Sequence, residues 1–255
     1  MNGLRREPEH NPRRFRHFMT KPSHRSSLAL NRISLLEGLP AQRLDALARQ
    51  CLWQTVDAEQ LLLARDDDRQ EVYFLVAGAV RVTTYSAQGR QVTFRDCLAG
   101  ELFGDIAAID GMPRSADVMT IESSVVASLD RAAFRALLRD EPRVAERMMQ
   151  RLALLVRQLS ERVVDVSTLG VQGRLHVELL RLARLAGVTD NAARLAPAPR
   201  HAALASQIST TREQVTRELN VLARDGILMK EGSALVVADV ARLAGLVAPA
   251  RGGAV

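Results

Sequence analysis

The residues best equipped for chemistry lie near the carboxyl end of the 255-residue chain, in the segment 210–219. If this segment is a helix, Val215, Leu219 and Leu222 share one apolar stripe, and polar side chains share the opposite arc. An arginine can donate two hydrogen bonds to guanine, and a glutamate can accept one from the cytosine amino group. The pattern therefore predicts a helix that reads the major groove of double-stranded DNA. The predicted DNA contacts are Thr211, Arg212, Glu213, Gln214, Thr216 and Arg217.

Glu213 has a second interpretation, as part of the cap at the start of this helix. The capping-box pattern, a Ser or Thr followed three residues later by Glu or Gln, occurs twice, starting at Thr210 and at Thr211. The first of these matches would occupy the Glu213 carboxylate and remove it from base recognition. We favour base recognition because Arg212 and Arg217 share the arc of Glu213.

A second constellation occurs in residues 100–106 (GELFGDI) and 111–116 (GMPRSA). Gly104 allows a close backbone approach, and backbone amides that open a short helix form an anion site. Asp105 offers an acceptor for a ribose hydroxyl, and the forked guanidinium of Arg114 suits a phosphate. The alternative is a surface Asp–Arg pair beside a turn.

Hydrophobic periodicity divides the chain into a strand-rich half and a helix-rich half. Short alternating runs between about residues 52 and 129 predict a small antiparallel roll or barrel. The residues after 170 predict a helix-turn-helix followed by a hairpin, which is a winged helix. We expect an α+β protein with five segments. These are a basic disordered tail (1–27), a β-roll (28–141), a dimerisation helix (142–169), a winged helix-turn-helix (170–248) and a short tail (249–255).

The segment between these halves predicts one long helix from Pro142 to the residue before Gly170. At about 1.5 Å per residue its length would be roughly 40 Å. Its apolar seam is narrow and flanked by charges, as in a coiled-coil dimer. The alternative is a helix that packs on its own barrel. The predicted seam is Met148, Leu152, Leu155, Leu159, Val163 and Val166.

Composition and charge exclude several classes of protein. No apolar run approaches the roughly 18 residues of a membrane span, no secretory leader is recognisable, and we expect a cytoplasmic protein. The net charge is +6, and residues 1–27 hold seven basic against two acidic side chains. That tail is expected to be a leader without a specific role, or alternatively to contact DNA phosphates. Cys51 and Cys97 are too few for an iron–sulfur cluster or a structural zinc site, and we expect buried free thiols and no metal.

The order of roll, long helix and winged helix resembles the Crp/Fnr family of bacterial transcription regulators over about residues 28–240. Residues 103–105 and 114–116 look like the phosphate-binding cassette of that family. By this resemblance Arg114 and Ser115 hold a cyclic phosphate, and Asp105 takes the ribose 2′-hydroxyl. The resemblance implies an effector, cyclic AMP (cAMP) or cyclic GMP (cGMP). The implied ligand-binding residues are Phe103, Gly104, Asp105, Ile106, Arg114, Ser115, Leu159 and Ser160.

Two positions depart from the family pattern. Asp105 stands where the family usually has glutamate, so its carboxylate is one methylene further from the ribose. On the long helix the cAMP sensors of the family carry Thr-Ser where this chain has Leu159-Ser160. Leu159 cannot form a hydrogen bond with the base, whereas Ser115 could meet a guanine amino group. The resemblance also implies no haem, because no histidine lies between residues 28 and 175.

The leading hypothesis is a homodimeric regulator that is controlled by a cyclic nucleotide, cAMP before cGMP, and binds DNA and RNA polymerase. The resemblance implies half-sites that resemble TGTGA. One alternative is a regulator without an effector, in which Asp105 and Leu159 mark a degenerate pocket. Another is a nucleotide-binding regulatory subunit without DNA binding. We expect no enzymatic activity, because the sequence shows no phosphate-binding Walker loop and no nucleophile beside a base.

Overall fold

The computed structural model describes residues 21–22, 26–86, 89 and 91–247. The predicted tail at residues 249–255 and most of the predicted tail at residues 1–27 lie outside these described residues. The described pair Lys21–Pro22 forms strand β1, which pairs antiparallel with β2. That part of the amino-terminal segment is therefore a strand rather than the structureless leader we expected.

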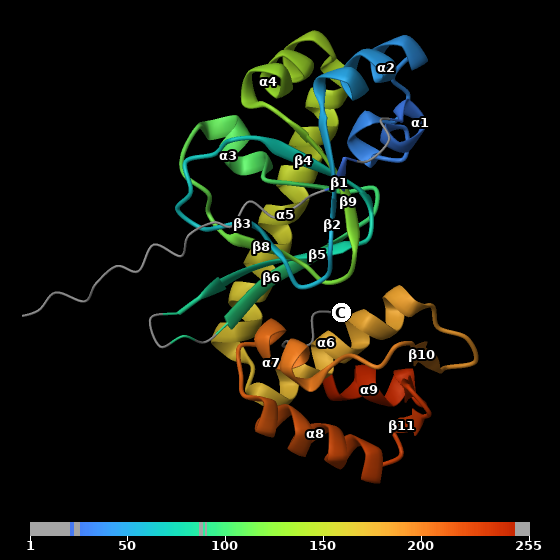
Figure 1. The fold of residues 1–255 in the computed structure, drawn as a ribbon. Coiled ribbons are helices and arrows are strands. Elements are labelled where there is room, and N and C mark those ends of the chain that lie inside the picture. Colours follow the sequence, from blue (N-terminus) through green and yellow to red (C-terminus); the bar gives the residue numbers. More distant parts are fainter. Residues whose placement is uncertain (1–20, 23–25, 87–88, 90, 248–255) are drawn as a thin grey trace, which may run out of the picture.

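The strand-rich half forms two antiparallel sheets that face each other as a roll, as the sequence predicted (Figure 1). One sheet has the strand order β1-β2-β9-β4-β7, and the other has the order β3-β8-β5-β6. The strands after β1 are β2 (Leu52–Val56), β3 (Leu61–Leu63), β4 (Val72–Ala77), β5 (Ala79–Tyr85), β6 (Gln91–Leu98), β7 (Leu102–Phe103), β8 (Asp117–Thr120) and β9 (Ser124–Leu129).

The turn between β4 and β5 shows why a glycine stands there. Gly78 has a φ of +86°, a conformation that residues with a side chain rarely adopt. A Cβ atom at this position would lie 2.3 Å from the Ser124 hydroxyl oxygen. Before this turn, β4 holds a run of buried residues, of which Phe74 and Leu75 are fully buried. The hydrophobic run thus explains strand β4, and Gly78 explains the turn that ends it.

Short helices cover the ends of the roll. They are α1 (Ser27–Leu30), the 3-10 helix η1 (Ser34–Leu36), α2 (Ala41–Gln50), α3 (Asp105–Asp110) and α4 (Arg131–Asp140). Asp130 caps α4, because its side chain accepts a hydrogen bond from the amide of Ala133 at 2.9 Å. This cap fixes the start of α4 at the residue after Asp130.

Helix α5 (Pro142–Thr168) runs along the roll and on to the second half of the molecule (Figure 1). Proline stands at its first turn, where its missing amide hydrogen costs no helical hydrogen bond. Val144 and Met148 are buried against the roll, whereas most of the residues after Met148 are half-buried or exposed. The predicted long helix is confirmed, and in the part of the chain that the structure describes none of its residues after Met148 is fully buried.

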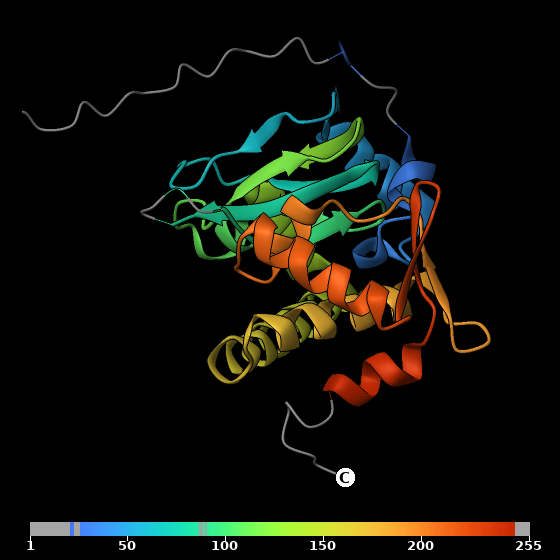
Figure 2. The same ribbon diagram turned by 90° about the horizontal axis from the view of Figure 1, so that it is seen from below.

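The helix-rich half has a hydrophobic core of its own, centred on α6 and α8. Its elements are α6 (Val171–Ala186), β10 (Ala193–Leu195), α7 (His201–Gln207), α8 (Arg212–Arg224), β11 (Leu228–Glu231), β12 (Ala234–Val237) and α9 (Val240–Val247). The hairpin of β11 and β12 is the predicted wing, and β10 adds a third strand that the sequence did not reveal. Figure 1 shows α8 on the side of this half that faces away from the roll, and Figure 2 shows the same helices from below.

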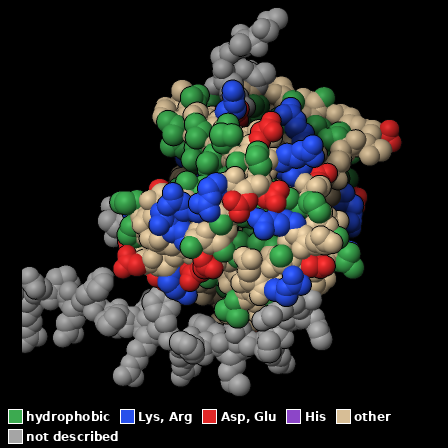
Figure 3. Space-filling model, turned by 90° about the horizontal axis from the view of Figure 1, so that it is seen from above, with side chains coloured by type: hydrophobic (Ala, Val, Ile, Leu, Met, Phe, Trp, Pro, Cys, Tyr) green, Lys and Arg blue, Asp and Glu red, His purple; other side chains and the backbone are tan. Residues whose placement is uncertain are grey.

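Seen from above, the molecule presents basic and acidic side chains intermixed over one face, with hydrophobic side chains gathered toward one edge (Figure 3). No helix in the described part of the chain is long and apolar enough to cross a membrane.

Candidate nucleotide cassette and DNA-reading helix

The start of α8 settles which of the two capping patterns forms. Thr211 is the N-cap, and its hydroxyl accepts a hydrogen bond from the amide of Gln214 at 3.4 Å. Gln214 in turn accepts a hydrogen bond from the hydroxyl of Thr210. The cap therefore uses the match that starts at Thr211, and the Glu213 carboxylate is left out of it.

The inner and outer faces of α8 are those that the sequence predicted. Val215 is fully buried, and Leu219 and Leu222 are buried beside it. Arg212, Glu213 and Arg217 are exposed. Their side chains form no hydrogen bond or ion pair with any residue that the structure describes. This arc can therefore meet a ligand without first breaking internal contacts.

Thr216 differs from its neighbours on the arc, because its hydroxyl already has two partners. It lies 2.7 Å from His201 Nδ1 and donates to the carbonyl of Arg212 at 2.9 Å. The first contact joins the two helices of the helix-turn-helix, α7 and α8. Thr216 thus helps to set the angle between them, and the contact to His201 was not evident from the sequence.

In the roll, β7 and α3 position the cassette. Gly104 precedes α3 with a φ of +78°, and a Cβ atom there would lie 2.8 Å from Arg114 Nη1. Phe103, the residue before it, is buried and stacks on Tyr73 with ring centroids 5.1 Å apart. Ile106 is 47% exposed. A glycine is needed at residue 104 both for the backbone angle and for the approach of the arginine.

Arg114 is held inside this cassette with only 3% of its surface exposed. Its Nη1 donates to the carbonyl of Gly104 at 2.9 Å, and its Nη2 donates to the carbonyl of Glu71 at 2.7 Å. Nη2 also lies 3.2 Å from the Glu71 carboxylate. Burial lowers the pKa of Arg114, because a charged group loses solvation there.

One atom of Arg114 is left without a partner. In the described part of the chain, Arg114 Nε is a buried nitrogen that forms no hydrogen bond. A buried unpaired donor on a positive group is costly, and an anion that accepts its hydrogen bond would remove that cost. The unpaired Nε of Arg114 and the hydroxyl of the next residue, the exposed Ser115, are hydrogen-bond donors that suit a phosphate group.

Asp105 lies next to Arg114 in the cassette, but its partner comes from the long helix. Its carboxylate oxygen Oδ2 lies 3.4 Å from Arg151 Nε, and Asp105 is 4% exposed. Arg151 also donates to the carbonyl of Leu102 at 2.8 Å and lies 3.6 Å from the Glu101 carboxylate. Asp105 was predicted as a cassette residue, whereas Arg151 and Glu71 were not, because both contacts join distant parts of the chain.

Helix α5 carries the remaining predicted ligand residues. The hydroxyl of Ser160 donates to the carbonyl of Val156 in its own helix at 2.9 Å, and Leu159 is 49% exposed. Five of its exposed apolar residues recur at intervals of seven, three, four and three, and the half-buried Leu152 divides the first interval into three and four. The five are Met149, Val156, Leu159, Val163 and Val166, whereas the exposed Leu154 and Val164 lie outside this heptad.

This heptad corrects one member of the predicted seam. Met148 is buried on the roll and does not belong to the open face, whereas Leu155 is half-buried in the same way as Leu152. Met149 and Val156, one residue after Met148 and Leu155, are among the exposed apolar side chains of the helix. Tertiary packing of the first turns on the roll decides which apolar stripe stays open, and the sequence pattern alone did not show this.

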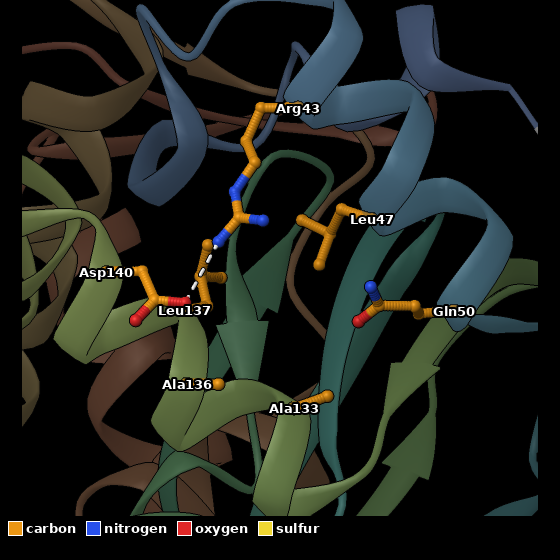
Figure 4. Close-up of a pocket in the computed structure, with 7 residues that line it drawn as sticks. All are labelled: Arg43, Leu47, Gln50, Ala133, Ala136, Leu137 and Asp140. Carbon is orange, nitrogen blue, oxygen red and sulfur yellow. Dashed lines mark ion pairs between the residues drawn. The ribbon is translucent and has the colours of Figure 1, made fainter.

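A separate depression of about 140 Å³ lies between α2 and α4 (Figure 4). Arg43 at its rim is ion-paired with Asp140 at 3.5 Å and with Glu141 at 2.9 Å. The charged groups at this rim are therefore satisfied by each other, and the depression lies apart from the cassette.

Together, the roll with its buried arginine and the winged helix with its open polar arc define a DNA-binding architecture that carries a separate β-roll domain. Comparison with protein families identifies a cyclic nucleotide-binding domain at residues 53–141 and a Crp-like helix-turn-helix domain at residues 173–246. These two matches make up more than half of the chain.

Curated relatives and solved structures agree with these matches. The chain is 26% identical to the CRP-like cAMP-activated global transcriptional regulator of Mycobacterium tuberculosis over 84% of this chain and 96% of that protein. It is 28% identical to the cyclic AMP receptor protein of Thermus thermophilus over 82% of this chain and 94% of that protein. The fold is similar to that of CLP, the c-di-GMP responsive regulator of Xanthomonas campestris, with a TM-score of 0.68 at 18% identity over 78% and 99% of the two chains.

The chain therefore belongs to the Crp/Fnr family and is a DNA-binding transcription regulator with a cyclic nucleotide-binding domain. This confirms the resemblance and the fold predicted from the sequence.

Proposed function

We propose that the protein is a homodimer that reads a palindrome of TGTGA-like half-sites under the control of a cyclic nucleotide. The observation that carries this proposal is the buried Arg114 with its unpaired Nε. A guanidinium nitrogen held out of water without a partner is explained by an anion that completes the site. The proposal favours cAMP over cGMP as that anion, because the curated relatives are named for cAMP.

In the proposed complex each cassette residue has a separate task. Arg114 and Ser115 hold the cyclic phosphate, and the absence of a side chain at Gly104 allows Arg114 to lie against the backbone there. Asp105 accepts the ribose 2′-hydroxyl, and Arg151 holds the aspartate in place through Oδ2. The anchoring by Arg151 fixes the shorter carboxylate of this chain, where the family usually has glutamate.

The proposed dimer forms along the heptad of α5. Valines stand at two of the three first positions, Val156 and Val163, and leucines at two of the three fourth positions, Leu152 and Leu159. β-branched residues at the first position with leucine at the fourth favour parallel two-stranded coiled coils. In this arrangement Leu159 lies in the dimer seam. Ser160 flanks the seam, where it would reach the base bound in the partner.

DNA recognition is assigned to the exposed arc of α8. Two copies in a symmetric dimer would place their α8 helices in major grooves one helical turn apart, so each operator would be a palindrome. Arg212, Glu213 and Arg217 supply the base contacts in this proposal, and RNA polymerase is the expected protein partner. Effector and DNA would each tighten the binding of the other by the same factor.

A second candidate is a regulator that needs no effector. It is favoured by the internal partners of the cassette, since Asp105 is already bound by Arg151 and Arg114 by Glu71. In this reading the internal ion pairs take the place of the nucleotide, and the protein binds DNA on its own.

Equilibrium binding of labelled cAMP and of labelled cGMP separates the two candidates. We expect saturable binding of one nucleotide, with competition by the unlabelled form and loss of binding in Arg114→Gln. Absence of binding by both, together with tight binding to an operator, would favour the effector-independent regulator. Unlabelled c-di-GMP in the same assay tests whether a different nucleotide occupies the roll.

A further inference from the structure

The roll and the helix-turn-helix touch each other through α7, which lies directly against β6 (Figure 1). At the centre of this contact the hydroxyls of Thr93 and Ser206 lie 2.6 Å apart. Thr93 is fully buried and Ser206 is 6% exposed. Two hydroxyls removed from water and paired across a domain boundary mark a specific contact rather than a chance approach.

Arg162 of α5 joins the same two elements from the side. Its Nη1 donates to the carbonyls of Thr93 at 2.5 Å and of Phe94 at 3.1 Å. Its Nη2 donates to the carbonyl of Gln207, the last residue of α7, at 2.5 Å. The guanidinium of Arg162 therefore forms hydrogen bonds both with strand β6 of the roll and with the end of helix α7.

The turn that follows α7 is held from its other side by α6. Arg174 Nε donates to the carbonyl of Ile208 at 2.9 Å. The next residue, Ser209, has a φ of +56°, which turns the chain into α8. Two consecutive carbonyls before the DNA-reading helix thus accept hydrogen bonds from arginines, and of these two arginines Arg162 also bonds to the roll.

This contact leaves the reading arc open. Arg212, Glu213 and Arg217 remain exposed while α7 is held against β6. A contact that masked DNA recognition would cover these side chains, whereas this one holds the element behind them. The arrangement is that of a support for the DNA-reading helix.

We propose that Arg162, together with the Thr93–Ser206 hydroxyl pair, positions α8 for DNA by clamping the end of α7 to the β-roll. The clamp lies on the helix that also carries Arg151 at the cassette, so α5 connects both sites. The proposal depends on DNA binding by α8 and is independent of whether a nucleotide is the effector.

The test compares Arg162→Gln with Arg157→Gln in the full-length protein. Arg157 is an exposed arginine of the same helix whose side chain forms no hydrogen bond or ion pair with the described residues, so its replacement controls for the lost charge. The probe is a DNA duplex selected from a random pool by the wild-type chain, and affinity is measured by fluorescence anisotropy at fixed salt. We expect Arg162→Gln to bind about tenfold more weakly, a coupling of ordinary size for a contact outside the interface.

Hydrogen exchange on the same samples reports the clamp itself. Amides of β6 and of the end of α7 should lose protection in Arg162→Gln and keep it in Arg157→Gln. The double variant Thr93→Val/Ser206→Ala removes both hydroxyls without leaving one unpaired, so it should fold normally and bind the duplex about threefold more weakly.

Two results would overturn the proposal. One is unchanged DNA affinity in Arg162→Gln despite lost protection, which would make the contact structural only. The other is equal weakening in Arg162→Gln and Arg157→Gln, which would reduce the effect to general charge. If no duplex were selected by the wild-type chain, the assignment of α8 to DNA would fail instead, while the exchange data would still report the contact.

Discussion

The cassette and the reading arc differ in how their charged residues are held. In the roll, Arg114 and Asp105 are buried and bound to Glu71 and Arg151. On α8, the arginines and the glutamate of the arc stand in solvent without internal partners. The first site is built in advance by contacts between distant segments, and the second is a surface arranged by a single helix.

This difference follows from what each site has to recognise, a small anion in the roll and a DNA groove on α8. A site for a small anion gains from donors whose positions are fixed before the ligand arrives, since ordering them costs free energy otherwise. A major groove is wide, and long side chains on a rigid helix can adjust to it. We therefore expect substitutions in the cassette to act on both affinity and folding, and substitutions on the arc to act on affinity alone.

The largest effect is expected for Arg114→Gln, which removes the charge from the cassette. Losing the hydrogen bond that the charged Nε would donate, worth about 1.5 to 3 kcal/mol, should weaken nucleotide binding about 10- to 150-fold. Thermal unfolding should also occur at a lower temperature, because Glu71 and the carbonyl of Gly104 lose their partner. Calorimetric titration with cAMP and a melting curve check both expectations.

Arg139→Gln is the matched control, since Arg139 is exposed and pairs only with its neighbour Asp140. Ser115→Ala should fold like the wild type and weaken nucleotide binding about fivefold, as expected for one hydrogen bond. If Arg114→Gln bound the nucleotide as tightly as the wild type, the assignment of Arg114 to the nucleotide site would be wrong.

A large effect is also expected in the dimer seam, which connects the two regions. Val163→Glu would place a carboxylate from each copy into the apolar seam, at a cost of several kcal/mol. The dimer should dissociate at micromolar concentrations, as sedimentation would show. Val164→Glu is the control, because Val164 is 56% exposed and lies outside the heptad. Equal dissociation of the two variants would contradict the seam.

An intermediate effect is expected on the reading arc. Arg217→Ala should cost about 1 to 3 kcal/mol of operator binding and relax the preference at one guanine. Competition with operators that carry single base changes measures this. Arg224→Ala, at the exposed end of the same helix, should weaken binding without changing the preference. An unchanged base preference after Arg217→Ala would refute the assignment, and the melting temperature should stay the same in both variants.

The smallest effect is expected from thiol reagents. Burial raises the pKa of Cys51 and of Cys97 to about 12, so almost no thiolate forms near neutral pH. Because the thiolate is the reactive form, both residues should resist iodoacetamide in the folded protein and react after denaturation. Mass spectrometry of the alkylated protein checks this, and rapid labelling of either cysteine in the native state would contradict the buried-thiol prediction.

How much of each site the sequence predicted also differs between the cassette and the reading arc. The reading arc needed only the periodicity of one helix, because Val215 and Leu219 on one side assign Arg212 and Glu213 to the other. The cassette residues were found through a resemblance, but their partners were not. Arg151 stands 46 residues from Asp105, and no local pattern links the two.

Other elements show the same limit. Strand β10 has three residues and is fixed by pairing with β12, so its short sequence carries little signal of its own. The open seam of α5 differs from the predicted seam at Met148, because that side chain is buried against the roll. Periodicity gave the existence of the helix and its bounds, whereas packing decided which stripe stays exposed.

The most direct test of the account is the affinity of the purified protein for a TGTGA palindrome, measured by fluorescence anisotropy at fixed salt, alone and with cAMP or cGMP. We predict that one nucleotide, cAMP first, tightens binding at least fivefold, with no such change in Arg114→Gln. Absence of binding to the palindrome under all three conditions would contradict the assignment of Arg212, Glu213 and Arg217 to TGTGA-like half-sites.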